Sequence, residues 1–399
     1  MSDNKVIHTA NSRTLIRNNM RNYSMFIILA LIMLVFAPLT GGVNFNPRNF
    51  TNIFFQYSYV LILATGMVQC IIILGIDLAV GSVCAFIGAL SVMLYNLGVG
   101  MPVTVLASLI MGLCVGAFQG WFVAYPKVPA FIVTLAGMML FRGLTYVVTN
   151  VNPISPVDDG YSYFSTGSVD ELLRLERVLD HYPAALVLAV VILVGYFIAE
   201  IMGRKTKIEN GFEVAPTVLF GLKLALITAI ALGLAERFAA YRGLPVVVIV
   251  VGVTVFIFQF IMKSTVLGRY IYAVGGNARS AKLSGINSEL ITFIVFSVMG
   301  LLTGLAAVVS TGYMNSALPQ AGNMFEMDAI AACYIGGVSA GGGIGTVVGV
   351  IVGGLVMSAI NNGMSLMNLG QYYQYIVKAL ILLLAVFYDV QSRRKTGLG

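Results

Sequence analysis

Charged side chains are scarce in this sequence of 399 residues, where Asp, Glu, Lys and Arg together make up 10%. Soluble globular domains carry roughly 25% charged residues, so a chain of this length could not cover a water-facing surface. Hydrophobic residues make up 59% of the chain and aromatic residues 11%. This excludes intrinsic disorder, because disordered chains are polar and poor in aromatic residues. The composition therefore indicates a polytopic membrane protein.

The residues that build metal and catalytic sites are also rare. The sequence holds two histidines and four cysteines, and it contains neither a Gly-x-x-x-x-Gly-Lys-Ser/Thr phosphate loop nor a His-Glu-x-x-His motif. The cysteines have no metal-ligand spacing and lie in apolar runs, so we interpret them as buried apolar side chains. They are Cys70, Cys84, Cys114 and Cys333. We therefore expect no metal site, no cofactor and no ATP-binding motif in this chain.

Apolar runs of about 20 residues, the length that a helix needs to cross a bilayer, recur along the chain. They predict an all-α polytopic membrane protein with about 10–12 transmembrane helices. The twelve candidate spans are 24–40, 53–74, 78–98, 102–125, 129–149, 182–202, 216–235, 244–262, 290–312, 329–344, 346–368 and 371–390. The weakest are 78–98 and 329–344, where glycine and polar residues interrupt the run.

The segments outside the spans are too short to form a soluble domain. We expect a polar N-terminal tail over 1–23, one transmembrane domain over 24–390 and a C-terminal tail over 391–399. The two longest connections are a polar outer loop, 150–181, and a basic loop on the side of the termini, 263–289.

Basic residues divide unequally between the two sides of the predicted membrane. Fifteen Lys and Arg fall on the side that holds both termini and five on the other. Because cytoplasmic loops carry the excess of Lys and Arg, we expect both termini in the cytoplasm. The outer loops collect acidic residues, among which we place Asp170, Glu326 and Asp328. The net charge of +7 therefore reflects the orientation in the membrane and does not indicate nucleic-acid binding.

Five ionisable residues fall at membrane depth: Asp77, Arg142, Glu200, Lys223 and Lys378. A charge at the bilayer centre costs about 2.5–3.5 kcal/mol on insertion scales, so each needs a partner, a cavity or a helix end. Asp77 precedes a plausible helix start at Leu78, and capping that helix is the simplest role for its carboxylate. A side chain that faces a transport pathway is the alternative.

Two glycine ladders predict close helix packing, because glycine at every fourth residue leaves a groove along one helix face. The longer comprises Gly337, Gly341, Gly345, Gly349 and Gly353, and the shorter comprises Gly112, Gly116 and Gly120. The alternative to tight packing is functional. The glycine-lined helix face would then shift between two packing arrangements, or its backbone would line a transport pathway. The run 341–343 predicts a helix break, and glycine-interrupted segments in both halves of a chain point to transport sites. The candidate pathway or helix-break residues are Asp77, Gly81, Ser82, Gly337, Ser339 and Gly341.

The basic loop 263–289 contains residues typical of the start and the end of a helix, which an unstructured linker does not need. Asn277 can cap a short helix over 278–284, and Gly285 stands where that helix would stop. A capped helix between glycines is not needed in an ordinary positively charged loop. We therefore predict a docking element for a cytoplasmic partner.

Four stretches of the sequence resemble the monosaccharide ABC importer permeases of the ribose, galactoside and xylose group. The first is Gly268-Arg269-x-Ile271-x-Ala273-x-Gly275-Gly276-Asn277, followed by Ala281-x-x-Ser284-Gly285-Ile286. The others are Gly75-Ile76-Asp77-Leu78-Ala79-Val80-Gly81-Ser82, Val128-Pro129-Ala130-Phe131-Ile132-Val133-Thr134-Leu135, and 326–332 with 336–339. The resemblance spans about residues 50–390. The two apolar runs at 182–202 and 216–235, where shorter members have one, favour the longer xylose or multiple-sugar branch.

The resemblance implies a permease of the vitamin-B12-permease-like importer fold in a bacterial cytoplasmic membrane, carrying a pentose such as xylose. It implies a second copy of the permease, a cytoplasmic ATPase subunit that binds ATP and Mg, and a periplasmic or tethered sugar-binding protein. The family's coupling helix corresponds to 277–286. The ATPase-coupling residues implied are Gly268, Arg269, Gly275, Gly276, Asn277, Ala281, Ser284 and Gly285.

Two other functions are compatible with parts of the sequence. A secondary transporter would use Asp77 as an ion site, but the intramembrane charges do not form an acidic relay. An intramembrane hydrolase would rest on Gly337-Val338-Ser339-Ala340-Gly341, which matches the Gly-x-Ser-x-Gly of serine hydrolases. The two histidines, His8 in the tail and His181 in the outer loop, are not placed to act as its base. The importer permease is the function that the sequence favours.

Overall fold

The computed structural model describes residues 12–212, 214 and 216–396, and their regular structure is helical. The helices are α1 (Ser12–Leu39), η1 (Val43–Phe45), α2 (Pro47–Ile72), α3 (Val80–Asn96), α4 (Met101–Ala124), α5 (Ala130–Thr149), α6 (Gly160–Thr166), α7 (Val169–Leu172), α8 (Pro183–Glu209), α9 (Thr217–Ala239), α10 (Val246–Ser264), α11 (Val266–Leu283), α12 (Ser288–Met314), α13 (Phe325–Ile335), α14 (Val347–Leu366) and α15 (Gln371–Thr396). Within the described chain, nine helices are long and apolar enough to cross a membrane, and Met25–Leu39 and Val80–Asn96 are shorter apolar helices. The prediction of an all-α polytopic membrane protein is confirmed.

The predicted span at 329–344 is wrong. Its helix, α13, begins at Phe325 and ends after 11 residues, and 336–346 is not helical. The backbone turns there through glycines in the left-handed region, with φ of +81° at Gly337 and +77° at Gly342. Residues other than glycine rarely adopt this conformation. The other weak span, 78–98, is the 17-residue helix α3.

Helices also run into the segments expected to be tails. α1 begins at Ser12 and α15 continues to Thr396. The remainder of the two predicted tails, 1–11 and 397–399, lies outside the described residues. The outer loop 150–181 contains the short helices α6 and α7.

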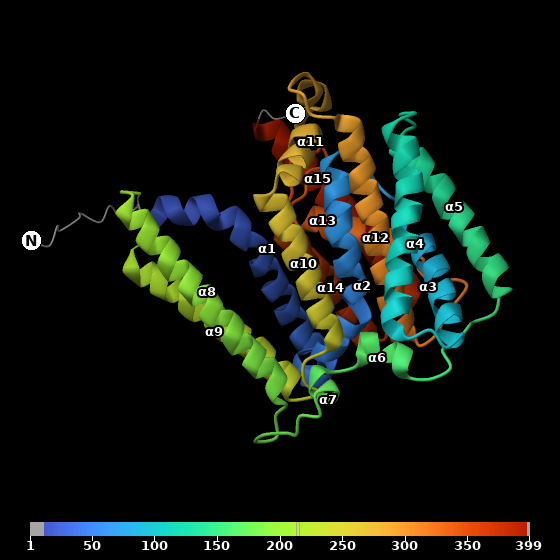
Figure 1. The fold of residues 1–399 in the computed structure, drawn as a ribbon. Coiled ribbons are helices and arrows are strands. Elements are labelled where there is room, and N and C mark those ends of the chain that lie inside the picture. The colour runs from blue at the N-terminus through green and yellow to red at the C-terminus, as the bar shows by residue number, and fades with distance from the viewer. Residues whose placement is uncertain (1–11, 213, 215, 397–399) are drawn as a thin grey trace, which may run out of the picture. The chain divides into compact units, whose positions relative to one another are not determined.

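The chain divides into two compact units. In its described part, the first unit comprises 12–27, 45–51, 168–212, 214 and 216–245, and the second comprises 28–44, 52–167 and 246–396. The first unit contains the antiparallel hairpin of α8 and α9 (Figure 1). Asp170, which is fully buried, joins three parts of that unit, because its two carboxylate oxygens accept the N–H groups of Ala184 and Leu244, both at 2.9 Å.

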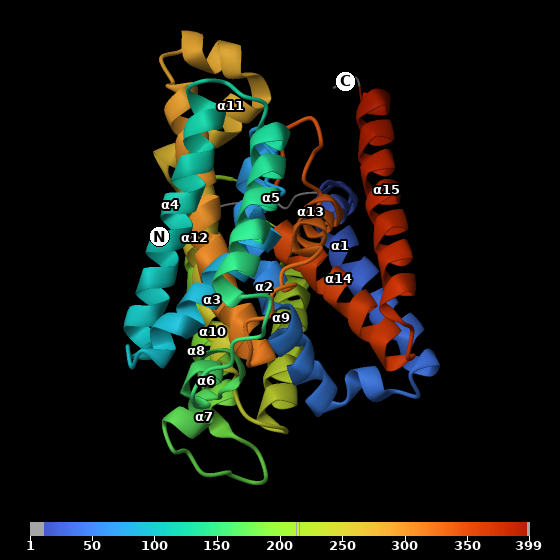
Figure 2. The same ribbon diagram turned by 90° about the vertical axis from the view of Figure 1, so that its right-hand side faces the viewer.

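The core of the second unit is built on α2, α12 and α14, whose apolar stretches are mostly buried within the protein. In contrast, α4, α5, α10 and α15 leave most of their apolar surface open, as expected of helices that contact lipid. Figures 1 and 2 show α11 at one end of this unit, where α4 joins α5 and where α15 finishes. This end carries the candidate docking element.

The shorter glycine ladder packs α4 directly on α12. A Cβ atom built on Gly112 would stand 2.2 Å from the carbonyl oxygen of Gly300, and one on Gly116 would stand 2.8 Å from the Cα of Gly300. A Cβ on Gly300 would in turn stand 2.2 Å from the carbonyl oxygen of Gly112. The two backbones are therefore in contact with no side chain between them, which agrees with the prediction of tight helix packing.

Adding a single methyl group at this crossing should destabilise the protein. Overpacking a tight interface costs about 1–3 kcal/mol, so we expect Gly300→Ala to lower the free energy of unfolding by that amount. Gly143, on α5, has nothing within 4 Å of a built Cβ, so Gly143→Ala is the matched control. Reversible unfolding in mixed micelles, followed by circular dichroism, measures both variants. Equal midpoints for the two variants would contradict the prediction.

Candidate functional site

The residues 277–285 form an exposed, capped segment at the end of α11. Asn277 has non-helical dihedral angles, φ −161° and ψ 98°, which kink α11 at this position. Its Oδ1 accepts the backbone N–H of Ser280 at 2.9 Å, which is the geometry of a helix N-cap. The predicted cap is confirmed. The sequence did not predict that 266–276, expected to be loop, is also helical.

The segment ends in a glycine turn. Gly285 has φ +85°, and its N–H donates to the carbonyl of Lys282 at 3.1 Å. The N–H of Ile286 donates to the carbonyl of Ala281 at 3.0 Å. These two bonds define a Schellman motif, which satisfies the last carbonyls of the helix. The prediction that Gly285 stops the helix is confirmed.

Side chains on the 277–285 segment divide between the protein and the surroundings. Ala281 is buried, whereas Leu283 is 85% exposed. The segment is therefore held on one face and open on the other.

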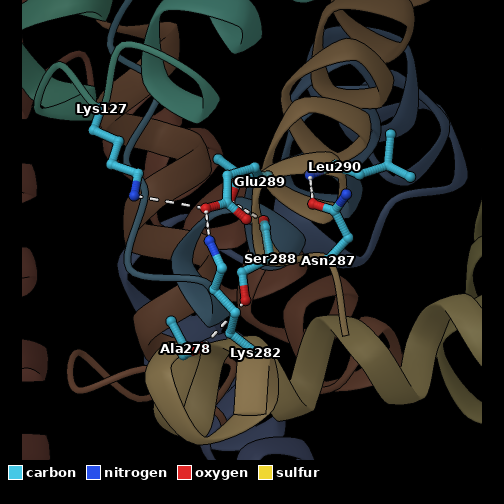
Figure 3. Close-up of polar contacts among 8 residues, drawn as sticks. Lys127, Ala278, Lys282, Asn287, Ser288, Glu289 and Leu290 are labelled. Atoms are coloured by element: carbon cyan, nitrogen blue, oxygen red, sulfur yellow. Dashed lines mark hydrogen bonds and ion pairs between the residues drawn. The ribbon is translucent and has the colours of Figure 1, made fainter. Parts of the chain in front are cut away.

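A carboxylate between two lysines joins this segment to the link between α4 and α5 (Figure 3). Glu289 forms ion pairs with Lys282 of the segment and, at 3.6 Å, with Lys127 of the link. The Ser288 hydroxyl adds a hydrogen bond to the carbonyl of Ala278 at 3.2 Å. The first turn of α12 therefore holds the segment against its neighbour.

The other residues of the predicted coupling set separate into inward-facing and outward-facing positions. Gly268 and Gly275 are buried, and a Cβ on Gly268 would stand 2.4 Å from the carbonyl oxygen of Met262 on α10. Arg269, Gly276 and Ser284 are exposed. The inward glycines set how closely α11 approaches its neighbours, and the outward residues form a surface.

The first predicted helix break lies between α2 and α3, over residues 73–79. Asp77 is 3% exposed, and its Oδ1 accepts the N–H of Ala79 at 2.9 Å. The prediction that Asp77 caps a helix beginning at Leu78 needs correction, because the helix begins at Val80 and Ala79 is its N-cap residue. The carboxylate instead satisfies a backbone N–H in the turn before the helix.

The first turn of α3 lies against the link between α12 and α13. A Cβ on Gly81 would stand 2.0 Å from the carbonyl oxygen of Gly322 and 2.6 Å from Oε2 of Glu326. The neighbouring Ser82 is 1% exposed, and its hydroxyl has no hydrogen-bond partner among the described residues. Arg142 donates to the carbonyl of Ala321 at 2.6 Å. Three separate segments thus meet at this point.

The second predicted break, with Gly337, Ser339 and Gly341, lies in the non-helical segment 336–346. The longer glycine ladder is therefore not one helix face, and only its last two members belong to a helix, α14. Ser339 is 1% exposed, and its hydroxyl lies 3.4 Å from Oδ2 of Asp389. The same Oδ2 accepts the N–H of Ala340 at 3.0 Å. The motif match to serine hydrolases thus falls in a loop that a carboxylate on α15 holds in place.

Three acidic residues that we expected in outer loops are buried: Asp170 does lie in the outer loop, on α7, whereas Glu326 and Asp328 lie on α13. Glu326 is 8% exposed, Asp328 is 2% exposed, and Asp170 is fully buried. Asp328 lies on α13 and forms an ion pair with Lys378 of α15, with 2.8 Å between Nζ and Oδ1. Sequence reasoning missed this pair because the two residues are separated by 50 positions.

The other outer-loop acids behave as expected of surface residues. Asp158 is exposed, and it accepts the hydroxyl of Tyr95 at 2.7 Å and the N–H of Gly160 at 2.8 Å. The Tyr95 hydroxyl, followed by the Gly160 N–H, lowers the pKa of the Asp158 carboxyl. This carboxyl therefore keeps its negative charge at the end of the second unit opposite α11.

No group of three metal-ligating side chains occurs within residues 12–212, 214 and 216–396. All four cysteines are free, and three of them are buried as predicted. Cys114 is exposed, which corrects the interpretation that all four are buried. It lies on α4, a helix that leaves much of its apolar surface open.

Removing one partner of the buried Asp328–Lys378 pair should be costly, because it leaves an uncompensated buried charge. We expect Lys378→Met to lower the free energy of unfolding by about 3–5 kcal/mol. Adding Asp328→Asn to Lys378→Met should restore most of that loss, since no charge then remains. A denaturation series on the two single variants and the double variant in micelles measures the coupling. Additive losses would contradict a direct interaction.

Comparison with known proteins gives one family for most of this chain. Residues 49–386 match the family model described as branched-chain amino acid transport system / permease component. The xylose transport system permease protein XylH of Haemophilus influenzae is 37% identical over 378 residues, covering 94% of this chain and 98% of that protein. XylH of Escherichia coli K12 is 38% identical over 387 residues, covering 95% of this chain and 94% of that protein.

A second group of relatives is somewhat more distant. The ribose import permease protein RbsC of Escherichia coli K12 is 34% identical over 363 residues, covering 91% of this chain and 92% of that protein. No solved structure matches. The family match and these relatives each extend over the helices that hold both predicted breaks and the 277–285 segment. The chain therefore belongs to the family of branched-chain amino acid transport system permease components.

Proposed function

We propose that this chain is the permease subunit of an ATP-driven importer that carries a monosaccharide, a pentose such as xylose, across the bacterial cytoplasmic membrane. The observation that carries the proposal is the identity of 37–38% to xylose permeases over about 95% of the chain. The ribose permeases at 34% identity support the same class of cargo. The chain itself performs no chemical reaction in this proposal.

The charges at the two ends of the second unit support an orientation with both termini in the cytoplasm. The end at α11 presents Lys127, Arg269 and Arg279, whereas the opposite end presents Asp158 and Asp159. Cytoplasmic loops carry the excess of basic residues. The 277–285 segment would then face the cytoplasm.

The match to transport permease components supports the partners, and the orientation assigns each of them a side. A separate ATPase subunit, which binds ATP and Mg, docks on the exposed side of the 277–285 segment, where Leu283 offers an apolar contact. A sugar-binding protein, periplasmic or tethered, delivers the monosaccharide at the opposite end. A second copy of the permease completes the pathway, and the lipid bilayer surrounds both copies. Nucleic acid has no part in the proposal.

The energy of ATP hydrolysis enters through this contact. Closure of the ATPase subunit displaces the 277–285 segment, and the pathway between the two permease copies changes from outward-facing to inward-facing. Such a change is a population shift, so the contacts of the segment must differ in free energy between the two states. The caps at Asn277 and Gly285 keep the segment folded while it transmits the load.

The decisive experiment is to purify the chain with its native ATPase and sugar-binding protein, and to screen sugars for stimulated ATP hydrolysis. We expect a pentose to stimulate hydrolysis and to accumulate in proteoliposomes in proportion to the ATP consumed. Hexoses, amino acids and a complex without the sugar-binding protein are the controls. Uptake that persists without the ATPase but collapses with the proton gradient would instead indicate a secondary transporter.

The docking role of the 277–285 segment is tested by Asn277→Ala within it and by Gly276→Trp at the exposed residue directly before it. Gly276→Trp puts a bulky side chain on the docking surface, and Asn277→Ala removes a cap worth about 0.5–2 kcal/mol. We expect both to reduce ATPase-coupled uptake, with the stronger loss for Gly276→Trp. Asn277→Asp keeps the capping oxygen and should recover most of the activity. Unchanged coupled uptake in reconstituted complexes of both variants would exclude the docking assignment.

A further inference from the structure

The inner face of α11 crosses two other segments at a point where no side chain intervenes. A Cβ atom built on Gly275 would stand 2.0 Å from the carbonyl oxygen of Ile72, at the end of α2, and 3.0 Å from the backbone nitrogen of Gly343. One built on Gly343 would stand 3.0 Å from the Cα of Gly276. Gly275 itself is buried. The backbones of α11, α2 and the 336–346 loop are therefore in direct contact.

Hydrogen bonds close this crossing. The N–H of Gly343 donates to the carbonyl of Ile72 at 2.9 Å. The hydroxyl of Tyr272, less than one turn before Gly275, donates to the carbonyl of Gly345 at 2.6 Å. Gly342 and Gly343 have φ of +77° and +69°, so the loop reaches this contact in a conformation that other residues rarely adopt. We call the contact of Ile72, Tyr272, Gly275, Gly342 and Gly343 the glycine crossing.

The glycine crossing lies directly beside the proposed docking segment. Gly275 is two residues before Asn277, where α11 kinks and the exposed segment begins. On its other side, the crossing connects to both predicted helix breaks, because the 336–346 loop joins α13 to α14 and Ile72 ends the helix before Asp77. The crossing therefore gives a displacement of the exposed segment a direct backbone route to both breaks.

Direct contact between backbones is suited to carrying such a displacement. Side chains can absorb a movement by changing rotamer, whereas close-packed backbones transmit strain because the interior has low compressibility. We propose that the glycine crossing transmits movement of the 277–285 segment to α2 and to the 336–346 loop, with Tyr272 and Gly275 as positioning residues. This inference rests on the proposed function, because it assumes that an ATPase moves the segment.

Tyr272→Phe and Gly275→Ala test the crossing in different ways. Tyr272→Phe removes only the hydroxyl that bonds Gly345 and adds no atom. Gly275→Ala pushes a methyl group against the Ile72 carbonyl and forces the backbones apart. Gly252→Ala on α10 is the matched control, because a Cβ there has nothing within 4 Å. All are measured in the full complex in proteoliposomes.

The expected result is a loss of coupling without a loss of assembly. For Tyr272→Phe and Gly275→Ala, the amount of sugar transported per ATP hydrolysed should fall by a factor of about two to thirty, the range of coupling effects for such positions. For Tyr272→Phe, which changes a residue outside the predicted ATPase-coupling set, ATPase binding and basal hydrolysis should stay at the level of the parent complex and of Gly252→Ala. If Gly275→Ala does not fold, Tyr272→Phe alone decides the outcome.

Two results would overturn the inference. One is an unchanged ratio of sugar to ATP in Tyr272→Phe. The other is a ratio that falls only in parallel with thermal stability or ATPase binding, since a merely structural contact would behave in that way. Either result leaves the proposed function intact as long as the parent complex couples sugar uptake to hydrolysis. A parent complex in which the ATPase does not bind, or sugar does not stimulate it, would refute the proposed function itself.

Discussion

Backbone N–H and C=O groups at a helix break need partners from the protein, because the hydrocarbon core of a bilayer supplies none. This constraint governs the irregular segments of the second unit. The carboxylate of Asp77 satisfies the N–H of Ala79, and Arg142 satisfies the carbonyl of Ala321. Asp389 accepts the N–H of Ala340 in the 336–346 loop. At these breaks, a charged side chain supplies the hydrogen-bond partner that the free backbone N–H and C=O groups need.

The same constraint explains how the few intramembrane charges are used. All five residues predicted at membrane depth have polar partners: Asp77 and Arg142 bind backbone groups, Lys378 pairs with Asp328, and Glu200 pairs with Lys223 at 2.6 Å. Each charge thereby avoids the cost of an isolated ion in an apolar medium. Arg142 and the Lys378–Asp328 pair connect segments that are distant in sequence, whereas Asp77 holds a turn within its own segment. We therefore regard them as structural connections of the fold.

Glycine supplies the second kind of connection, a direct contact between backbones. On α4 and α12 it produces one tight helix pair, whereas at Gly275 and Gly343 it brings a helix, a helix end and a loop together. The first contact joins two long helices in the body of the second unit. The second lies next to the exposed 277–285 segment, where an external partner can apply a load. Glycine contacts thus pack two helices together in one place. In the other place, in our proposal, they transmit movement of the 277–285 segment.

Much of this protein follows from its sequence alone. Apolar runs and their length determine the all-α membrane class, since a bilayer requires about 20 apolar residues in a helical span. The caps at Asn277 and Gly285 were predictable because both depend on residues within one or two turns. Only the tertiary structure decided that Asp328 is buried against Lys378, that the longer glycine ladder is mostly loop, and that Gly275 meets Ile72. Such contacts join residues far apart in the chain, and no local pattern records which of them will meet.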